Sequence, residues 1–237
     1  MITGAIIFSR MSSKRLPGKA LIDIEGKNLL QRTIERTKKI ELIDRIILAT
    51  SILEEDDLIS ETALDEDIEI FRGDLDFVAL RALGACEKFN LDHFVRICGD
   101  RPFFDPRIID RLIQTHLKDN FDITTTMHPR TYPPGLTGEV IKYSVMKNTL
   151  RLMYLEEDKE HVTSFFYKNH HNFKIKNVGS LPEEDYEGVE LVVDNQEDLN
   201  KIRWIASKLD LGDSLDEEMK KIIKLAKLWP DYLKELG

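Results

Sequence analysis

The chain is poor in the residues that mark several large classes of protein. Only two of its 237 residues are cysteine, Cys86 and Cys98, so a disulfide framework and a cysteine-rich zinc site are both excluded. No apolar run approaches the roughly 18 residues that a membrane-spanning helix needs. The phosphate-binding patterns G-x-G-x-x-G and G-x-x-x-x-G-K-[ST] are also missing, which gives no support to a dinucleotide-binding fold or a P-loop.

Positive charge is scarce as well. The chain has 34 Lys and Arg residues against 43 Asp and Glu, a formal net charge of −9. An anionic protein disfavours a nucleic-acid partner, although a local basic segment still suffices to bind one phosphate group. Hydrophobic residues at 42% and charged residues at 32% are typical of a folded globular protein with a substantial core.

The first residues do not match a secretory signal. A short apolar run over 5–8 is followed at once by Arg10, Lys14, Arg15 and Lys19. A signal peptide places its charges first and then a longer apolar stretch. We therefore expect a cytoplasmic protein with no membrane partner.

Apolar runs alternate with helical patterns through the first half of the chain. Strands are predicted over 5–8, 45–49, 68–71, 94–98 and 122–126, and helices over 28–39, 54–63, 77–89 and 106–117. Continuous apolar strands separated by helices are typical of a parallel sheet covered on both faces. The expected fold class is therefore α/β.

The second half of the chain has a different pattern. Residues 131–138 are rich in Pro, Gly and Thr and predict an irregular loop, whereas the alternation over 139–143 predicts an antiparallel strand. Further strands are expected over 173–178 and 190–193, and an amphipathic helix after Asp213. Because no linker or repeat is visible, we expect one domain over 1–237, with a subregion at about 127–178 and C-terminal helices at about 195–237.

The most informative segment is residues 9–19, here called the basic loop, which directly follows the first predicted strand. Open α/β sheets bind ligands at the carboxyl ends of their strands, and small side chains let backbone amides approach an anion. Guanidinium and ammonium groups both bind phosphate oxygens. The basic loop contains four cations and three small residues, Arg10, Ser12, Ser13, Lys14, Arg15, Gly18 and Lys19. It predicts a phosphate site; the alternative is a solvated loop without a ligand.

The basic loop also resembles the signature of a known family. Its residues 10–19 are similar to A-R-x-G-S-x-R-L-P-G-K of the sugar-acid cytidylyltransferases, which include the acylneuraminate and 3-deoxy-manno-octulosonate enzymes. The pattern is most similar to the spore coat polysaccharide biosynthesis protein F group. Further matching segments follow in order at 47–51, 71–81, 96–106, 132–140, 160–163 and 193–199. Two positions depart from the pattern: Ser12 replaces a glycine, and Thr137-Gly138 replaces an acidic position.

The resemblance implies a Rossmann-like, three-layer nucleotidyltransferase fold with a mostly parallel sheet and a small antiparallel subregion. It implies a cytidylyltransferase that transfers CMP from CTP to a sugar or sugar-acid acceptor, with release of pyrophosphate, in surface polysaccharide or glycoconjugate biosynthesis. The dimeric relatives suggest a homodimer. The triphosphate would be held by Arg10, Ser12, Ser13, Arg15 and Lys19, and the catalytic residues would be Arg10, Lys19 and Asp100.

Magnesium is the expected cofactor, because Mg²⁺ in nucleotide sites takes one or two carboxylates together with phosphate oxygens and water. Asp100 directly follows the predicted strand 94–98, and Asp194 follows 190–193. Both carboxylates are therefore expected to face one cleft. Asp100 also fits an ordinary turn, and Asp194 also fits the start of a helix capping box that runs to Glu197.

Recognition of the cytosine base is expected at the ends of the second and third strands, at Thr50, Ser51, Arg72 and Gly73. Arg72 also fits a surface ion pair with Asp74 or Asp76. The acceptor is expected over the variable half of the chain, at Arg130, Gly135, Glu139, Glu160 and His161. There Arg130 would meet a carboxylate, Glu139 would accept hydroxyl donors, and His161 would bind or deprotonate the acceptor hydroxyl unless it makes only a structural hydrogen bond.

Two other functions stay open. Asp74-Leu75-Asp76 matches the D-x-D metal motif of a nucleotide-sugar-dependent glycosyltransferase with a similar sheet. A noncatalytic nucleotide-binding protein of the same fold is the other. The basic loop favours a free triphosphate and hence nucleotidyl transfer.

Overall fold

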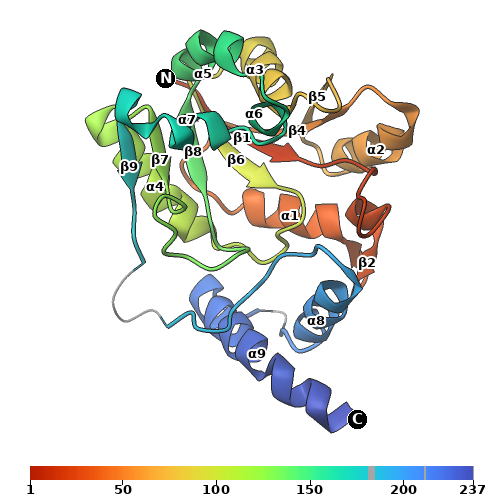
Figure 1. Ribbon diagram of the computed structural model, residues 1–237. Helices are drawn as coiled ribbons and strands as arrows, with labels where there is room; N and C mark the ends of the chain where they lie inside the picture. The colour runs from red at the N-terminus through yellow and green to blue at the C-terminus, as the bar shows by residue number, and fades with distance from the viewer. Residues whose placement is uncertain (181–184, 211, 237) are drawn as a thin grey trace.

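A mixed sheet forms the centre of the protein in a computed structural model that describes residues 1–180, 185–210 and 212–236 (Figure 1). Within these residues the sheet has seven strands in the order β5-β4-β1-β6-β8-β7-β9. Their bounds are β1 (Thr3–Phe8), β4 (Arg45–Ser51), β5 (Glu69–Gly73), β6 (His93–Cys98), β7 (Ile123–Thr125), β8 (Glu139–Lys142) and β9 (Ile175–Asn177). A small hairpin, β2 (Asp23–Ile24) and β3 (Lys27–Asn28), lies outside this sheet.

Strand direction confirms the expected fold class. β1 pairs in parallel with β4 and β6, and β4 pairs in parallel with β5. β8 runs antiparallel to both of its neighbours, β6 and β7, and β7 is again parallel to β9. A mostly parallel sheet with one reversed strand is thus what the described residues form, and the antiparallel strand expected over 139–143 is confirmed.

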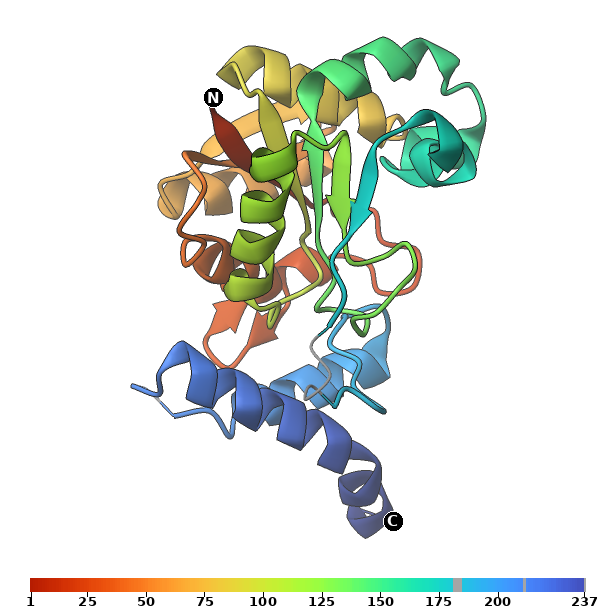
Figure 2. The same cartoon turned by 90° about the vertical axis from the view of Figure 1, so that its left-hand side faces the viewer.

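Helices cover the sheet on both faces and so make three layers. The helices are α1 (Leu29–Thr37), α2 (Asp57–Asp65), α3 (Val78–Phe89), α4 (Pro106–Asp119), α5 (Tyr143–Thr149), α6 (Glu156–Glu160), α7 (Ser164–Lys168), α8 (Gln196–Ala206) and α9 (Leu215–Leu236). Successive strand residues point to opposite faces: Ala5 and Ile7 pack with α1, α2 and α4, whereas Ile6 packs with α3, α5 and α7. Figure 2 shows α8 and α9 beyond one edge of this sandwich, where they enclose a third core cluster.

Local signals explain why the helices begin where they do. The Asn28 side chain accepts a hydrogen bond from the Gln31 amide, and the Gln31 side chain accepts one from the Asn28 amide, which completes a capping box for α1. Asp105 caps α4, and Pro106 occupies its first turn. Both helices therefore lie close to their predicted bounds. No helix in the described part of the chain is both long and apolar enough to cross a membrane.

The strand expected over 190–193 is wrong. Within this segment the Leu191 amide donates to the Pro134 carbonyl at 2.9 Å, and the Val193 amide donates to the Asp100 carbonyl at 3.0 Å. These bonds go to two loops and form no ladder with a strand. The apolar side chains of Leu191 and Val193 belong to the core cluster beside α8 and α9. Their alternation thus reflects burial against loops and helices.

Candidate active site

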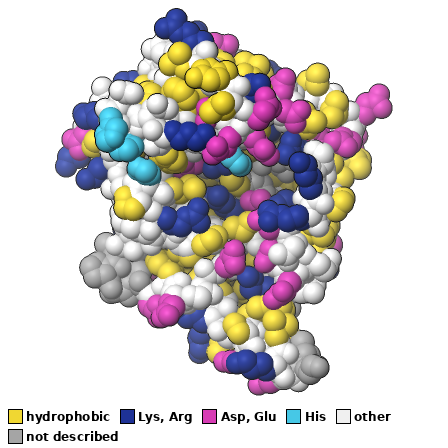
Figure 3. All heavy atoms as spheres, in the orientation of Figure 1, with side chains coloured by type: hydrophobic (Ala, Val, Ile, Leu, Met, Phe, Trp, Pro, Cys, Tyr) yellow, Lys and Arg dark blue, Asp and Glu magenta, His cyan; other side chains and the backbone are white. Residues whose placement is uncertain are grey.

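A cavity of about 410 Å³ opens at the carboxyl ends of β1 and β6. Its walls come from the basic loop, the first part of α3, the end of α6 and the segment before α8. Figure 3 shows Lys and Arg side chains gathered around a hollow on this face, although the whole chain is acidic. The volume suits a ligand of nucleotide size. The basic loop therefore lines a cleft, with the side chains of Lys14 and Arg15 exposed to solvent.

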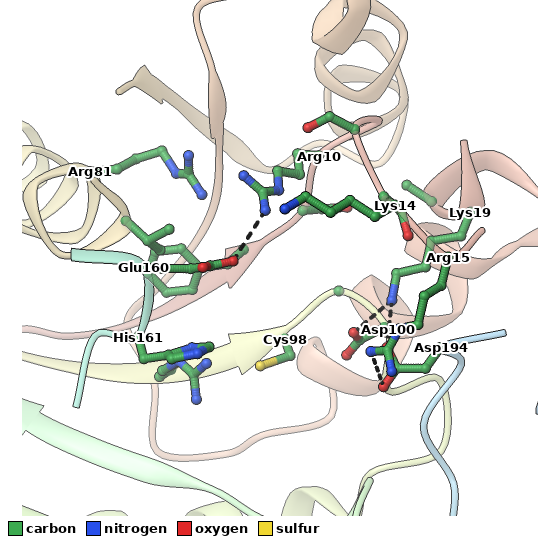
Figure 4. Close-up of a pocket in the computed structure, with 18 residues that line it drawn as sticks. Arg10, Lys14, Arg15, Lys19, Arg81, Cys98, Asp100, Glu160, His161 and Asp194 are labelled. Atoms are coloured by element: carbon green, nitrogen blue, oxygen red, sulfur yellow. Dashed lines mark hydrogen bonds and ion pairs between the residues drawn. The ribbon is translucent and has the colours of Figure 1, made fainter. Parts of the chain in front are cut away.

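Three of the expected site residues meet at one end of the cavity. Lys19 Nζ lies 2.9 Å from Asp100 Oδ2, 3.2 Å from Asp194 Oδ1 and 2.7 Å from the Val193 carbonyl oxygen (Figure 4). Arg15 adds a second cation, 2.9 Å from Asp194 Oδ2. We call these four side chains, Arg15, Lys19, Asp100 and Asp194, the open ion cluster.

The helix cap beside the open ion cluster lies one residue later than expected. Asn195, and not Asp194, accepts hydrogen bonds from the Glu197 and Asp198 amides, and Asp198 Oδ2 accepts from the Asn195 amide in return. The capping box that was expected to begin at Asp194 is therefore wrong. Because Asn195 caps α8, the Asp194 carboxylate is left to bind Lys19 and Arg15.

A residue that the sequence did not single out holds the basic loop in place. Asp56 is fully buried, and its carboxylate accepts hydrogen bonds from the Met11 amide at 2.7 Å, the Ser51 amide at 3.0 Å and the Ser51 hydroxyl at 2.5 Å. Burial by itself would raise the pKa of Asp56, but these hydrogen bonds outweigh it and hold that pKa below its usual value. A charged Asp56 thus ties the basic loop to the end of β4.

The candidates for base recognition lie outside the lining of the cavity. Thr50 and Ser51 are fully buried. The Arg72 guanidinium donates to the carbonyls of Ser51 at 2.8 Å and Leu53 at 2.7 Å, and it pairs with Asp57. The alternative pairing with Asp74 or Asp76 is therefore wrong. The assignment of Thr50, Ser51, Arg72 and Gly73 to the base stays a prediction, with the Arg72 side chain already engaged by the protein.

The acceptor candidates separate into two groups. Glu160 and His161 line the cavity, opposite the open ion cluster. Arg130 and Gly135 do not line it. Gly135 has a φ of +97°, and a Cβ there would lie 2.7 Å from the backbone of Leu191, so this position needs glycine for packing. The structure therefore brings only part of the expected acceptor set to the cleft.

Glu139 is the acceptor candidate whose expected role the structure corrects. Its side chain is 1% exposed, with Oε2 accepting from Arg96 Nη1 at 2.8 Å and Oε1 accepting from the Tyr167 hydroxyl. Both carboxylate oxygens are occupied, so Glu139 does not present a free oxygen to an acceptor. Arg96 itself lines the cavity. We call Arg96, Glu139 and Tyr167 the buried ion cluster.

Charge in the buried ion cluster is fixed by its own contacts. Burial favours the neutral form of Glu139, but Arg96 and the Tyr167 hydroxyl outweigh burial, and the pKa of Glu139 lies below its usual value. Burial and then the Glu139 charge raise the pKa of Tyr167. Glu139 is thus an anion and Tyr167 a neutral donor, and the pair fixes the guanidinium of Arg96.

The D-x-D string has a structural role. Asp74 Oδ1 accepts hydrogen bonds from the amides of Asp76 at 2.9 Å and Phe77 at 2.6 Å, immediately before α3. The Asp76 side chain is 81% exposed, and neither carboxylate lines the cavity. This arrangement fits a turn that starts a helix and gives no support to a metal motif.

The fold and the cleft define a nucleotidyltransferase, and comparisons with known proteins identify its family. A family model described as cytidylyltransferase matches residues 4–227. The chain therefore belongs to the cytidylyltransferase family, whose members are CTP-dependent nucleotidyltransferases. This confirms the resemblance found in the sequence and sets aside the glycosyltransferase alternative.

Individual relatives agree with this family. The chain is 28% identical to the spore coat polysaccharide biosynthesis protein SpsF of Bacillus subtilis, over 97% of this chain and 96% of that protein. It is 33% identical to the 3-deoxy-manno-octulosonate cytidylyltransferase of Bdellovibrio bacteriovorus, over 52% of this chain and 50% of that enzyme. A solved cytidylyltransferase of Leptospira borgpetersenii superposes with a TM-score of 0.89 at 26% identity, covering 98% of this chain and 96% of that one.

Proposed function

We propose that this protein transfers CMP from CTP to a hydroxyl of a sugar or sugar acid and releases pyrophosphate, as a step in surface polysaccharide or glycoconjugate biosynthesis. The observation that carries this proposal is the convergence of Lys19, the last residue of the basic loop, with Asp100 and Asp194 at one end of the cavity. The names of the spore coat and 3-deoxy-manno-octulosonate relatives support the class of acceptor and the pathway.

The reaction needs positioning and charge neutralisation more than covalent catalysis. The acceptor oxygen attacks the α-phosphorus of CTP, a new P–O bond forms, and the bond to pyrophosphate breaks. Arg10, Arg15 and Lys19 bind the triphosphate and stabilise the negative charge that collects on the leaving pyrophosphate. His161, on the far wall of the cavity, accepts the proton of the acceptor hydroxyl or passes it to water.

The chemistry of the open ion cluster fits magnesium. Carboxylate oxygens of Asp100 and Asp194 approach one cation, Lys19 Nζ, at 2.9 and 3.2 Å. In the described part of the chain no group of three or more His, Cys, Asp or Glu side chains is placed to hold a metal. Two carboxylates are nevertheless what Mg²⁺ uses when phosphate oxygens and water complete its shell. Bound with CTP, Mg²⁺ would supply charge neutralisation, and Lys19 would exchange its carboxylate partners for phosphate oxygens.

The decisive experiment measures pyrophosphate release from CTP and Mg²⁺ with a panel of sugar acids and neutral sugars, with ATP, GTP and UTP as nucleotide controls. We expect acceptor-dependent release that prefers CTP. Binding of CTP without turnover of any acceptor in a broad panel would contradict the proposal and favour a noncatalytic protein.

A variant at His161 tests where the acceptor binds. We expect His161→Ala to raise the acceptor KM or lower turnover while the CTP Kd stays nearly unchanged. Loss of CTP affinity with normal acceptor kinetics would place the acceptor elsewhere in the cleft. We also propose that the protein acts in the cytoplasm and that it is a homodimer. Light scattering of the purified protein tests the homodimer.

A further inference from the structure

A second cavity, here called the α1 cavity, is separate from the active site. Its volume is about 500 Å³, and no described residue lines both this cavity and the first one. Its lining comes from α1 and the residues just after it, from Glu218 in the first turns of α9, and from Pro102 and Phe103. Pro102 and Phe103 belong to the loop after β6 that also carries Asp100. The α1 cavity therefore adjoins one end of that loop.

Positive charge exceeds negative charge in the lining of the α1 cavity. The described lining contains five cations and three carboxylates, Lys27, Arg32, Glu35, Arg36, Lys38, Lys39, Glu66 and Glu218. Two ion pairs cancel charge within it, Lys27 with Glu35 and Lys38 with Glu66. The other three cations have one carboxylate of the described lining left to them, Glu218. A local excess of positive charge thus remains, although the whole chain is acidic.

These three cations are Arg32, Arg36 and Lys39, and their spacing of four and three residues places them on one side of α1. Arg36 is only 4% exposed. Its Nη2 lies 2.9 Å from Glu218 Oε1, and its Nη1 is buried without a hydrogen-bond partner in the described part of the chain. Lys39 Nζ is 3.7 Å from Glu218 Oε2. Glu218 is therefore divided between two cations.

No carboxylate of a described residue forms a salt bridge with Arg32. Its Nε donates to the Ile24 carbonyl at 2.7 Å, and its Nη2 donates to the Glu25 carbonyl at 3.0 Å. Burial lowers the pKa of both Arg32 and Arg36, and the neighbouring carboxylates offset this effect only in part. A cation withdrawn from water is tolerated best when an opposite charge meets it. The α1 cavity therefore favours an anion.

We propose that the α1 cavity binds a small phosphate-bearing anion through Arg32, Arg36 and Lys39. A phosphate group carries close to two negative charges at neutral pH, which matches the excess of cations in the lining. Its oxygens suit two guanidinium forks and one ammonium group. Because Arg36 is almost fully buried beside Glu218, the ligand reaches it when the Glu218 side chain turns away, so Glu218 competes with the ligand. This site lies outside the active cavity and does not depend on the proposed function.

The test measures the Kd of inorganic phosphate by calorimetry, with CTP and Mg²⁺ in the active cavity and no acceptor present. We expect Arg32→Gln to raise this Kd about 10-fold, the effect of losing one charge-assisted hydrogen bond. Lys39→Gln removes an exposed point charge and should raise it about 2- to 5-fold. Lys147→Gln is the matched control, because Lys147 is exposed and pairs with Glu87 but lines neither cavity. Its phosphate Kd should equal that of the wild type.

Another variant should act in the opposite direction. Glu218→Gln removes the competing carboxylate, so we expect the phosphate Kd to fall several-fold. Arg32→Lys keeps the charge without the fork and should give an intermediate Kd; it also serves if Glu218→Gln does not fold. Purely structural roles of Arg32 and Glu218 would not give these opposed effects on one Kd. Glycerol 3-phosphate, titrated in the same way, distinguishes the source of the anion, because tighter binding than inorganic phosphate indicates a phosphate ester and weaker binding indicates the free ion.

Two results would overturn the inference. Phosphate binding that CTP abolishes, and that Arg32→Gln and Lys39→Gln leave unchanged, would place the ion in the active cavity alone. The absence of saturable phosphate binding below about 10 mM would remove the site altogether. Phosphate binding that depends on Arg32, in a protein that turns over no acceptor, would contradict the proposed function and leave the α1 cavity site in place.

Discussion

The two ion clusters of the cleft use the same chemistry for different purposes. In the open ion cluster the side chains of Lys19, Asp100 and Asp194 are 16%, 24% and 35% exposed, and all three lie outside the strands and the α-helices. In the buried ion cluster Arg96 and Glu139 face each other across the antiparallel pair β6–β8. The first cluster can exchange partners with a ligand, whereas the second is part of the framework that shapes the cleft.

The largest expected effect follows from removing a charge from the buried ion cluster. Glu139→Gln leaves the Arg96 guanidinium without its counter-ion, and we expect a loss of about 3–5 kcal/mol in the free energy of unfolding, measured by urea denaturation. The matched control is Glu69→Gln, which breaks an exposed pair with Arg45 and should cost less than about 1 kcal/mol. Equal losses in the two variants would mean that Glu139 does not stabilise the framework.

Substitutions in the open ion cluster should lower activity and leave stability nearly unchanged. Lys19→Ala should lower turnover by about 10²–10³, the typical effect of losing one donor to a transition-state anion, with little change in the melting temperature. Lys27→Ala, at an exposed lysine paired with Glu35, is the control for removing a positive charge. Near-normal turnover of Lys19→Ala would exclude the basic loop from the active site.

The dependence of activity on Mg²⁺ tests the role of Asp100 and Asp194. Asp100→Asn keeps the shape of the side chain but removes a charge, so we expect loss of Mg²⁺-dependent activity with an intact fold, seen in an Mg²⁺ titration of pyrophosphate release. We expect Asp194→Asn to raise the Mg²⁺ requirement as well. Full activity of both variants at low Mg²⁺ would show that the metal assignment is wrong.

Acid pH should remove the contribution that the Glu139 charge makes to the stability of the fold. The pKa of Glu139 is lower in the folded protein than its ordinary value of 4.5, so its charge stabilises the fold above that pH, and this contribution is lost as the pH falls through the folded-state pKa. The difference in unfolding free energy between wild type and Glu139→Gln should therefore be constant near neutral pH and shrink below about pH 4.5. A difference that grows in acid would contradict a charged Glu139.

The smallest effect is expected at the start of α8. Asn195→Ala should cost about 1 kcal/mol of stability because it removes the helix cap, whereas Asp194→Asn should cost less than about 0.5 kcal/mol, since the Asp194 carboxylate makes no capping bond. Thermal melts of the two variants measure the difference. A larger loss of stability in Asp194→Asn than in Asn195→Ala would show that Asp194 caps α8.

Features written in short stretches of sequence were predictable. β1, the basic loop and α4 follow from an apolar run, a cluster of cations and a proline after a capping aspartate. Asp100 was also accessible, because a carboxylate that directly follows a buried strand lies at the sheet edge. The cap of α8 was placed one residue early because Asp194 and Asn195 are both good capping residues, and only the fold decides between them.

Contacts between distant segments were not accessible in the same way. The pairing of Arg96 with Glu139 depends on the register of an antiparallel strand 43 residues later in the chain, and the sequence pattern alone does not set that register. Glu139 was therefore expected in the cleft, while Arg96 was overlooked. The extended segment before α8 shows the same limit, since an apolar alternation does not reveal whether a sheet or a set of loops buries it.

Asp56 carries a consequence for how variants of this protein would be interpreted. Its carboxylate connects the Met11 amide with the end of β4, yet it does not line the cavity. Asp56→Ala would release the basic loop and so resemble a substitution of a phosphate-binding residue in any screen for activity. A genetic map of the cleft would thus include a position that never meets the nucleotide.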